Sequence, residues 1–305
     1  MNKPTVQDIF QCFYPAYLEK YSPSPEQAKV ARNILNCKTG AYGANVSVCE
    51  DCGAVQIHYN SCCNRCCPMC QAVPKEIWMD ARREDVLDAP YFHLVFTVPD
   101  ILNPIIYNNQ KLLYDTLYHA ASATISELTA DPKHLGANVG YICILHTWGS
   151  EMNFHPHIHT ILLGGGLTSK NEWKDNGTAF FLPIWAISKV FRGKYMDELK
   201  NLWNTNQLEF HGTAEKYRNH YTFKELLDSC YDAEWIPYCK KTFNGAQSVI
   251  DYLGKYTHRI AISNHRIICM DDGNVTFSVK DYRNKGQWKE LTLSGVEFIR
   301  RFLMH

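Results

Sequence analysis

The sequence NFHPHIHTILL, residues 153–163, carries a histidine at every second position from His155 to His159 and then continues as an apolar run. Successive side chains of a β-strand point to opposite faces, so His155, His157 and His159 are expected on one face. Histidine is the commonest metal ligand, and packed imidazoles need partners. The stretch therefore predicts a metal site on a strand. The alternative is a solvated strand face whose histidines have no ligand role.

The bulk composition is that of a globular protein. The chain has 305 residues, of which 46% are apolar and 20% charged, so it can bury the cores of two domains or of one domain with insertions. Its 31 basic and 31 acidic residues exclude a grossly basic nucleic-acid coat, although a local basic face is compatible with this total. No secretion signal and no membrane-length apolar run is present, so we expect a cytoplasmic protein without membrane contacts.

Cysteines concentrate in one region: eight of the 13 lie between residues 37 and 70. In a reducing compartment such a cluster indicates metal binding rather than disulfides. Two C-x-x-C turns, each directing two thiolates at one tetrahedral ion, predict a zinc-ribbon site. We assign it to Cys49, Cys52, Cys67 and Cys70. A second zinc ion is an open alternative, and so is a role as small buried residues, for Cys37, Cys62, Cys63 and Cys66, with His58 as a spare ligand.

The order of predicted elements indicates an α+β fold. Helical spacing over residues 5–20 and a capping box at Ser24 precede the cysteines, and a further helix spans 74–88. We place a domain boundary after residue 89, so that domains 1–89 and 90–305 follow each other, with a helical insertion at about 165–232. Strands are expected at 91–98, 138–148, 153–163, 235–241, 266–270, 275–280 and 288–293, and helices at 110–128, 184–204, 213–230 and from Ser294 onward.

The glycine-rich stretch 164–170 lacks the glycine spacing and the Gly-Lys-Ser/Thr ending of a phosphate-binding loop. We interpret it as the turn that ends the histidine strand, and we expect no nucleotide cofactor.

A helix expected over residues 244–259 places Tyr252 and Tyr256 four residues apart on one face. Taken alone, such a pair is best explained as core aromatics. The neighbouring cations Lys255, Arg259 and Arg266 and the histidine strand favour a functional role. From residue 240 onward the chain has 11 basic residues and six acidic ones, and this surplus of positive charge suits phosphate contacts.

These motifs carry a family resemblance. His157-Ile158-His159 is similar to the His-hydrophobe-His signature of HUH endonucleases. More specifically, the chain resembles the two-tyrosine rolling-circle transposases of the insertion-sequence-ninety-one type. The motifs that carry this resemblance are, in order along the chain, Cys49-x-x-Cys52-Gly53, Asn64-Arg65-x-Cys67-Pro68-x-Cys70, Phe96-Thr97-Val98-Pro99, His155-Pro156-His157-Ile158-His159, Tyr252-x-x-x-Tyr256-x-x-Arg259 and Ser263-Asn264-x-Arg266. The resemblance runs from about Cys37 to the last residue.

The chain also departs from this family. Members carry histidines where this chain has Asn45 and Cys66, and Cys63 is additional, so a second zinc site would use another ligand set. The family pattern continues into a further basic segment, and we therefore expect this chain to be truncated at its carboxyl end.

The resemblance implies an HUH endonuclease domain, an antiparallel sheet with helices of ferredoxin-like or RRM-like type, preceded by a helical and zinc-ribbon module. It implies that Mg or Mn bound by His157 and His159 activates a phosphate for attack by tyrosine, which gives a 5′-phosphotyrosine and then strand transfer. His155, His93, Glu151 and Gln247 remain alternatives for a third ligand. Tyr252 is assigned as the first nucleophile and Tyr256 as the second.

The implied partners are single-stranded DNA, transposon ends and target, contacted by Lys255, Arg259 and Arg266 in a prokaryotic cytoplasm or nucleoid; the oligomeric state is left open. Three alternatives remain: a rolling-circle replication initiator with the same HUH chemistry, a non-catalytic zinc-ribbon DNA-binding protein, and a metal hydrolase that uses the three histidines without the tyrosines.

Overall fold

The computed structural model describes residues 3–70, 72–175, 182–235, 238–241, 248–249, 251–252, 254, 260–281 and 286–305. Helices and antiparallel sheets alternate along the chain, so the expected α+β class is confirmed. Two compact units are present: residues 1–81, 148–154 and 253–305 form unit 1, and residues 82–147 and 155–252 form unit 2. Within the described residues no helix has the length and apolar character needed to cross a membrane.

These compact units do not contain the same residues as the two domains expected on either side of residue 89. They group C-terminal residues with N-terminal ones, whereas the sequence-based division followed the order of the chain. The boundary between domains remains a prediction.

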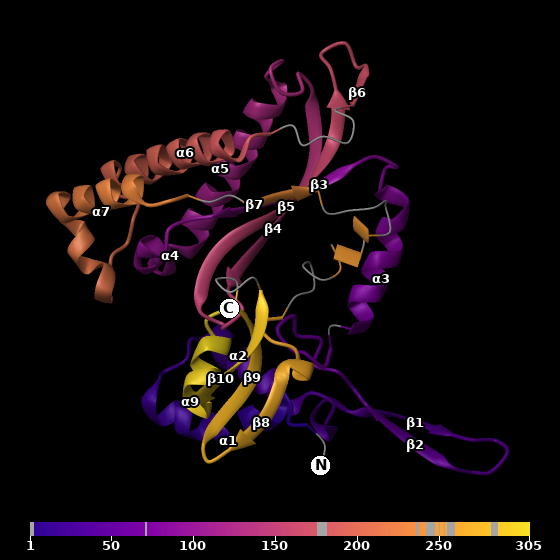
Figure 1. Cartoon of the computed structure of the whole chain (residues 1–305). Helices are drawn as coiled ribbons and strands as arrows, with labels where there is room; N and C mark the ends of the chain where they lie inside the picture. The colour runs from indigo at the N-terminus through magenta and orange to yellow at the C-terminus, as the bar shows by residue number, and fades with distance from the viewer. Residues whose placement is uncertain are drawn as a thin grey trace. The chain divides into compact units, whose positions relative to one another are not determined.

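Unit 2 is built on one antiparallel sheet. Its strands are ordered β4 (Asn138–Trp148), β5 (Phe154–Leu167), β3 (Tyr91–Thr97) and β7 (Tyr238–Lys241), and β6 (Trp173–Asp175) pairs with β5 (Figure 1). The predicted strands at 91–98, 138–148 and 153–163 are therefore confirmed, and the strand predicted at 235–241 is confirmed over the described residues 238–241. β5 continues through its three glycines to Leu167, so the turn predicted at 164–170 begins only after Leu167. The histidine strand lies in the interior of the sheet between β4 and β3.

The register of β3 and β5 separates the two faces of this sheet. Phe96 lies opposite Ile158 and Phe92 opposite Leu162, and all four side chains are buried. On this face Phe96 contacts Phe191, with ring centroids 5.0 Å apart, which places a helix over it. Val95 lies opposite His159 and Thr97 opposite His157, so the alternating histidines occupy the other face.

The helices of unit 2 follow the predicted pattern. α5 (Gln110–Ala130) and α6 (Ile184–Asn204) pack against each other, and α7 (His220–Asp232) follows the 3-10 segment η4 (Gly212–Arg218) (Figure 1). The helices expected at 110–128, 184–204 and 213–230 are thus confirmed, apart from the 3-10 geometry at 212–218. Shorter elements complete the unit: η2 (Arg83–Asp85), η3 (Asp100–Leu102) and α4 (Asn103–Asn108).

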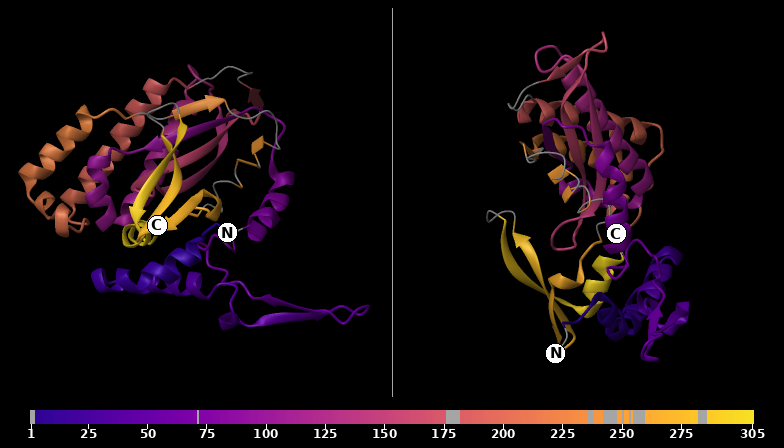
Figure 2. Two further views of the ribbon diagram at one scale, coloured as in Figure 1. Left: turned by 60° about the horizontal axis from the view of Figure 1, so that its bottom comes forward. Right: turned by 90° about the vertical axis from the view of Figure 1, so that its right-hand side faces the viewer.

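Unit 1 combines N-terminal helices with a C-terminal sheet. α1 (Val6–Lys20) and α2 (Pro25–Asn36) each begin with a capping box, and Ser24 accepts a hydrogen bond from the Gln27 amide as expected. The sheet has the order β10 (Gln287–Ser294), β9 (Asn274–Asp281) and β8 (Ile267–Asp271), and α9 (Gly295–Phe302) follows it (Figure 2). These elements share one core, which includes Phe10, Ile34, Phe277 and Phe298.

Three further elements of unit 1 flank the cysteines: η1 (Gly40–Tyr42), α3 (Ala72–Arg82) and the hairpin of β1 (Ala44–Val48) and β2 (Val55–Tyr59). Every residue of β1 and β2 is exposed, and the hairpin extends away from α1 and α2 as an arm (Figure 2). The stability of this hairpin therefore comes from the hydrogen bonds between β1 and β2 and from the residues where the hairpin joins the rest of unit 1.

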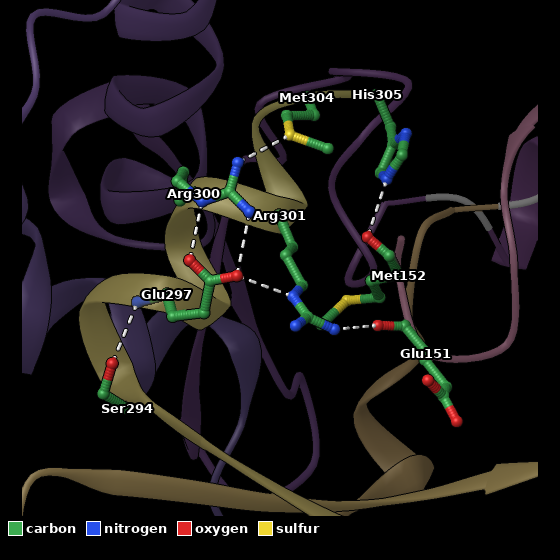
Figure 3. Close-up of polar contacts among 8 residues, drawn as sticks. All are labelled: Glu151, Met152, Ser294, Glu297, Arg300, Arg301, Met304 and His305. Atoms are coloured by element: carbon green, nitrogen blue, oxygen red, sulfur yellow. Dashed lines mark hydrogen bonds and ion pairs between the residues drawn. The ribbon is translucent and has the colours of Figure 1, made fainter. Parts of the chain in front are cut away.

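An ion-pair network joins α9 to the loop before β5 (Figure 3). The Glu297 carboxylate accepts hydrogen bonds from Arg300 at 2.6 Å and Arg301 at 2.8 Å, and Arg301 Nη1 donates to the Glu151 carbonyl at 3.0 Å. The hydrogen bond from Arg300, with that from Arg301, lowers the pKa of Glu297 to about 2. η5 (Asn264–Arg266) adds a second link, because Arg266 donates to the Ser150 carbonyl.

Candidate functional site

Three buried histidines converge on the face of the β4–β5–β3 sheet opposite the one that packs on Phe191. His146 comes from β4, and His157 and His159 come from β5. Among the described residues, one ligand atom from each of the three lies within 4.8 Å of the others. The three side chains are 1%, 8% and 8% exposed. Three imidazoles that are buried and lie this close together suit a bound cation.

The tautomers of the two β5 histidines support this interpretation. Nδ1 of His157 lies 2.7 Å from the His155 carbonyl oxygen and must donate to it, which leaves Nε2 of His157 with a lone pair. That Nε2 lies 3.0 Å from Nε2 of His159. Two nitrogen ligands at right angles around an ion, each with a bond of about 2.1 Å, are separated by about 3.0 Å. The residues therefore fit a divalent cation.

A tyrosine reaches the same cluster. Tyr252, in a helical segment, places its phenol oxygen 3.2 Å from Nδ1 of His159 and in contact with Nε2 of His93. His93 is on β3, is 7% exposed, and has Nε2 2.9 Å from Nδ1 of His159. Burial lowers the pKa of His93 to about 4, so its imidazole is neutral at neutral pH. The site thus unites a phenol, a neutral imidazole and three convergent histidines.

The third member of the histidine cluster, His146, is not among the alternatives that the sequence left open for the third ligand. His155 is not in the group; its Nδ1 instead lies 3.1 Å from a carboxylate oxygen of the exposed Asp100. The side chain of Glu151, another alternative, pairs with Lys289. His146 takes the place that the sequence analysis gave to these candidates. The predicted hairpin of 138–148 and 153–163 could have directed attention to it, because His146 and His157 both lie a few residues from the turn.

Several predicted site residues fall elsewhere. Tyr256, Lys255, Arg259 and Gln247 lie outside the described residues, so their roles remain predictions. Arg266 is buried, at 9% exposure, and its guanidinium donates to the carbonyls of Ser278 and Ser150 at 2.8 and 2.6 Å. In this structure the guanidinium has a structural role, and the DNA contact of Arg266 remains a prediction.

A second cluster consists of four cysteines in unit 1. Cys37 ends α2, Cys62 follows β2, and Cys67 and Cys70 lie in the turn before α3. Their sulfur atoms all lie within 4.8 Å of one another; Sγ of Cys70 is 3.3 Å from that of Cys37 and 3.5 Å from that of Cys62. A Zn–S bond of about 2.3 Å implies tetrahedral S···S separations of about 3.8 Å, so the four thiols fit one zinc ion.

This cysteine group differs from the predicted ligand set, which remains a prediction. Cys67 and Cys70 belong to it, but Cys49 and Cys52 are exposed at the tip of the β1–β2 hairpin, and Cys37 and Cys62 take their places. The hairpin carries the first C-x-x-C away from the core instead of folding it back. At that tip, hydrogen bonds from the Cys52 and Asp51 backbone lower the pKa of Cys49. Cys63 is exposed, and burial raises the pKa of Cys66; neither joins the group, and His58 lies on exposed β2.

Comparison with known proteins gives two family matches that together span most of the chain. Residues 140–305 match the family described as "Putative transposase", and residues 9–98 match the family described as "Transposase zinc-binding domain". Both the cysteine group and the histidine cluster lie within these ranges.

Individual proteins show the same relationship. The chain is 39% identical over 304 residues to "Putative transposase y4qJ" of Sinorhizobium fredii, which covers 99% of this chain and 76% of that protein. It is 28% identical over 289 residues to the transposase for insertion sequence element IS801 of Pseudomonas savastanoi pv. phaseolicola, covering 92% of this chain and 66% of that protein. Among solved structures, the metal-bound conjugative relaxase TrwC in complex with OriT DNA is matched with a TM-score of 0.31 and 12% identity, over 83% of this chain and 96% of that one.

Proposed function

The chain belongs to the IS91-type transposases with an N-terminal zinc-binding domain, and we propose that it cuts and rejoins single-stranded DNA at transposon ends through a tyrosine nucleophile. One observation carries the proposal: the phenol oxygen of Tyr252 lies 3.2 Å from Nδ1 of His159, whose other ring nitrogen belongs to the buried histidine cluster. A nucleophile and a cation site so close together suit phosphoryl transfer.

The cation would be held by His146, His157 and His159. Mg or Mn bound there would withdraw negative charge from the scissile phosphate. The His155 carbonyl fixes the tautomer of His157, so Nε2 is kept available as a ligand. A buried and hydrogen-bonded cluster also holds the ligand nitrogens in place before DNA arrives.

In the proposed step the phenol oxygen of Tyr252 attacks phosphorus and loses its proton. The bond from phosphorus to the 3′-oxygen breaks, the 3′-oxygen leaves as a hydroxyl after taking up a proton, and a 5′-phosphotyrosine remains. The phosphodiester energy is retained in this bond, so rejoining needs no nucleotide. Tyr256 is the proposed second nucleophile, which would let one site process two strands in rolling-circle transposition.

The zinc site has a separate task in this proposal. Cys37, Cys67 and Cys70 belong to the core shared by α1, α2, α9 and the C-terminal sheet. A zinc ion bound by these thiols and Cys62 would stabilise that core, because it would link the end of α2, at Cys37, to the turns that connect β2 to α3, which carry the other three thiols. Its role is structural, and the chemistry resides in unit 2.

The test is covalent capture of DNA. We expect the protein, mixed with a 5′-labelled and a 3′-labelled single-stranded transposon end and Mn, to form an adduct with the strand 3′ of the cut. Tyr252→Phe should abolish the adduct that forms through Tyr252, the proposed first nucleophile. The double variant Tyr252→Phe with Tyr256→Phe should abolish all adducts. Tyr221→Phe, at an exposed tyrosine of α7, is the matched control. An adduct that survives the double substitution would falsify the assignment, and DNA binding without any adduct would favour a non-catalytic zinc-ribbon protein.

A further inference from the structure

His93 contacts both halves of the proposed site without belonging to the cation-binding group. Its Nε2 lies 2.9 Å from Nδ1 of His159 and contacts the phenol oxygen of Tyr252. The rings of His93 and His159 are 5.2 Å apart and within 13° of parallel. The ring of Tyr252 is centred 4.6 Å from that of His93. One imidazole therefore packs on the nucleophile and on a ligand at the same time.

The strand register explains why His93 can do this. Val95 lies directly opposite His159, and His93 is two residues from Val95, so it projects from the same face as a diagonal neighbour of His159. Because β3 and β5 are paired inside the sheet, the backbone fixes the separation of the two rings. A residue held in this way can orient another side chain accurately.

The direction of the hydrogen bonds follows from the cation-binding tautomer. Nε2 of His159 faces Nε2 of His157, so when it binds a cation the proton of His159 must be on Nδ1. Nδ1 then donates a hydrogen bond, and the atoms within reach to accept it are Nε2 of His93 at 2.9 Å and the phenol oxygen of Tyr252 at 3.2 Å. Nε2 of His93 has one lone pair, so it accepts either from His159 Nδ1–H directly or from the phenol hydroxyl, whose oxygen then accepts from His159 Nδ1–H.

We propose that His93 is a positioning residue that couples cation binding to placement of the nucleophile, by holding the His159 ring and the Tyr252 phenol through its Nε2 atom. This rests on the proposed tyrosine chemistry. Residues that hydrogen-bond a metal-ligating histidine typically contribute roughly 10- to 100-fold to metal affinity. A phenol displaced by about 1 Å costs roughly 100-fold in rate.

The alternative is that His93 only fills space between β3 and the Tyr252 segment. Variants separate the two roles. His93→Phe keeps a ring of similar size and removes the hydrogen bond. His93→Gln can place its amide oxygen, a hydrogen-bond acceptor, near the position of Nε2, and His93→Asn can place one near the position of Nδ1. Positioning through Nε2 predicts rescue by glutamine but not by asparagine or phenylalanine, whereas space filling predicts that phenylalanine is the best tolerated.

The first measurement is Mn affinity of the full-length protein without DNA, from the electron paramagnetic resonance signal of free Mn. We expect His93→Phe and His93→Asn to weaken binding roughly 10- to 100-fold and His93→Gln to stay within about threefold of the wild type. His134→Ala, at a histidine outside the cluster, is the control. Equal Mn affinity in all of these proteins would overturn the proposal, and so would a loss that glutamine does not relieve.

The second measurement is the rate of adduct formation at saturating Mn and DNA. We expect a loss of roughly 100-fold in His93→Phe with an unchanged DNA concentration at half-maximal rate, and recovery in His93→Gln. If the wild type forms no adduct while the Mn results hold, the tyrosine chemistry fails and the orienting role toward His159 stands. If adducts form at equal rates in all variants, the proposal fails and the tyrosine chemistry stands. Should His93→Phe not fold, the comparison of His93→Asn with His93→Gln decides.

Discussion

The cysteine group offers a direct test, because the structure and the spacing of the cysteines point to different zinc ligands. Cys37 is fully buried and its Sγ lies 3.3 Å from that of Cys70, whereas Cys49 is exposed at the hairpin tip. Replacing Cys37 by serine removes one of four grouped thiols. Replacing Cys49 by serine leaves all four in place. The two variants therefore test which set binds the tightest zinc ion.

The expected magnitude follows from the number of ligands. Structural zinc contributes roughly 10–16 kcal/mol to small zinc-binding modules, so each of four thiolates contributes roughly 2.5–4 kcal/mol. This corresponds to a loss of roughly 10²- to 10³-fold in zinc affinity for Cys37→Ser. The loss is comparable to a large part of the total stability of a domain, about 5–15 kcal/mol. We therefore expect Cys37→Ser to unfold unit 1 at a lower temperature as well.

The number of protons released on zinc binding gives an independent measure of which thiols bind the ion. Burial raises the pKa of Cys62 to about 12 and raises that of Cys67, so both thiols are protonated at pH 7 when no metal is bound. Zinc binds thiolates, and its binding must release these protons. We expect the release of at least these two protons per zinc ion in the wild type and of about one fewer in Cys62→Ser. Because protons are released, zinc affinity rises with pH.

The assay is competition with a coloured zinc chelator, combined with titration calorimetry in two buffers of different ionisation enthalpy. Cys12→Ser, at an exposed cysteine of α1, is the matched control. Cys62→Ser, at a half-buried position, repeats the test where the risk of misfolding is smaller. The reasoning is refuted if Cys37→Ser and Cys62→Ser keep the wild-type affinity and proton count while Cys49→Ser loses them.

Two further predictions concern the histidine cluster and the α9 network. His146→Ala should weaken Mn binding at least tenfold while His155→Ala changes it less than threefold, measured on the DNA-free protein; the reverse order would restore His155 as the third ligand. Glu297→Gln should lower the free energy of unfolding by about 1–2 kcal/mol at pH 7, since a fall in pKa from 4.5 to about 2 corresponds to about 3.4 kcal/mol before screening by water. A depressed carboxylate pKa stabilises above pH 4.5, so the difference between the two proteins in denaturant unfolding should shrink as pH falls from 4.5 toward 2, and a constant difference would contradict the ion-pair explanation.

Much of the local structure could be predicted from the sequence. The strand β4 has the predicted bounds, 138–148, and the helix α6 has the predicted bounds, 184–204. Both follow from apolar periodicity, which local backbone geometry imposes. The predicted cap at Ser294 likewise accepts from the Glu297 amide at the start of α9. Family membership also followed from the order of the motifs and is confirmed by the family matches.

The choice of ligands could not be predicted in the same way. The sequence gives eight cysteines within 34 positions, and several pairs have suitable spacing. Which four meet depends on whether the β1–β2 hairpin folds back on the core or extends from it, and it extends. The burial of Arg266 could not be predicted for a similar reason, because it depends on the packing of β9 and of the loop at Ser150.

The sequence by itself determined that histidines alternate on a strand, that cysteines gather before it, and that Tyr252 follows it in a helical segment. These are properties of short segments, fixed by the two-residue period of strands and the 3.6-residue period of helices. Only the tertiary structure decided that His146 joins His157 and His159, and that His93 lies between His159 and Tyr252. These residues come from three strands and a helical segment. Their distances are set by strand order and register, which no short segment encodes.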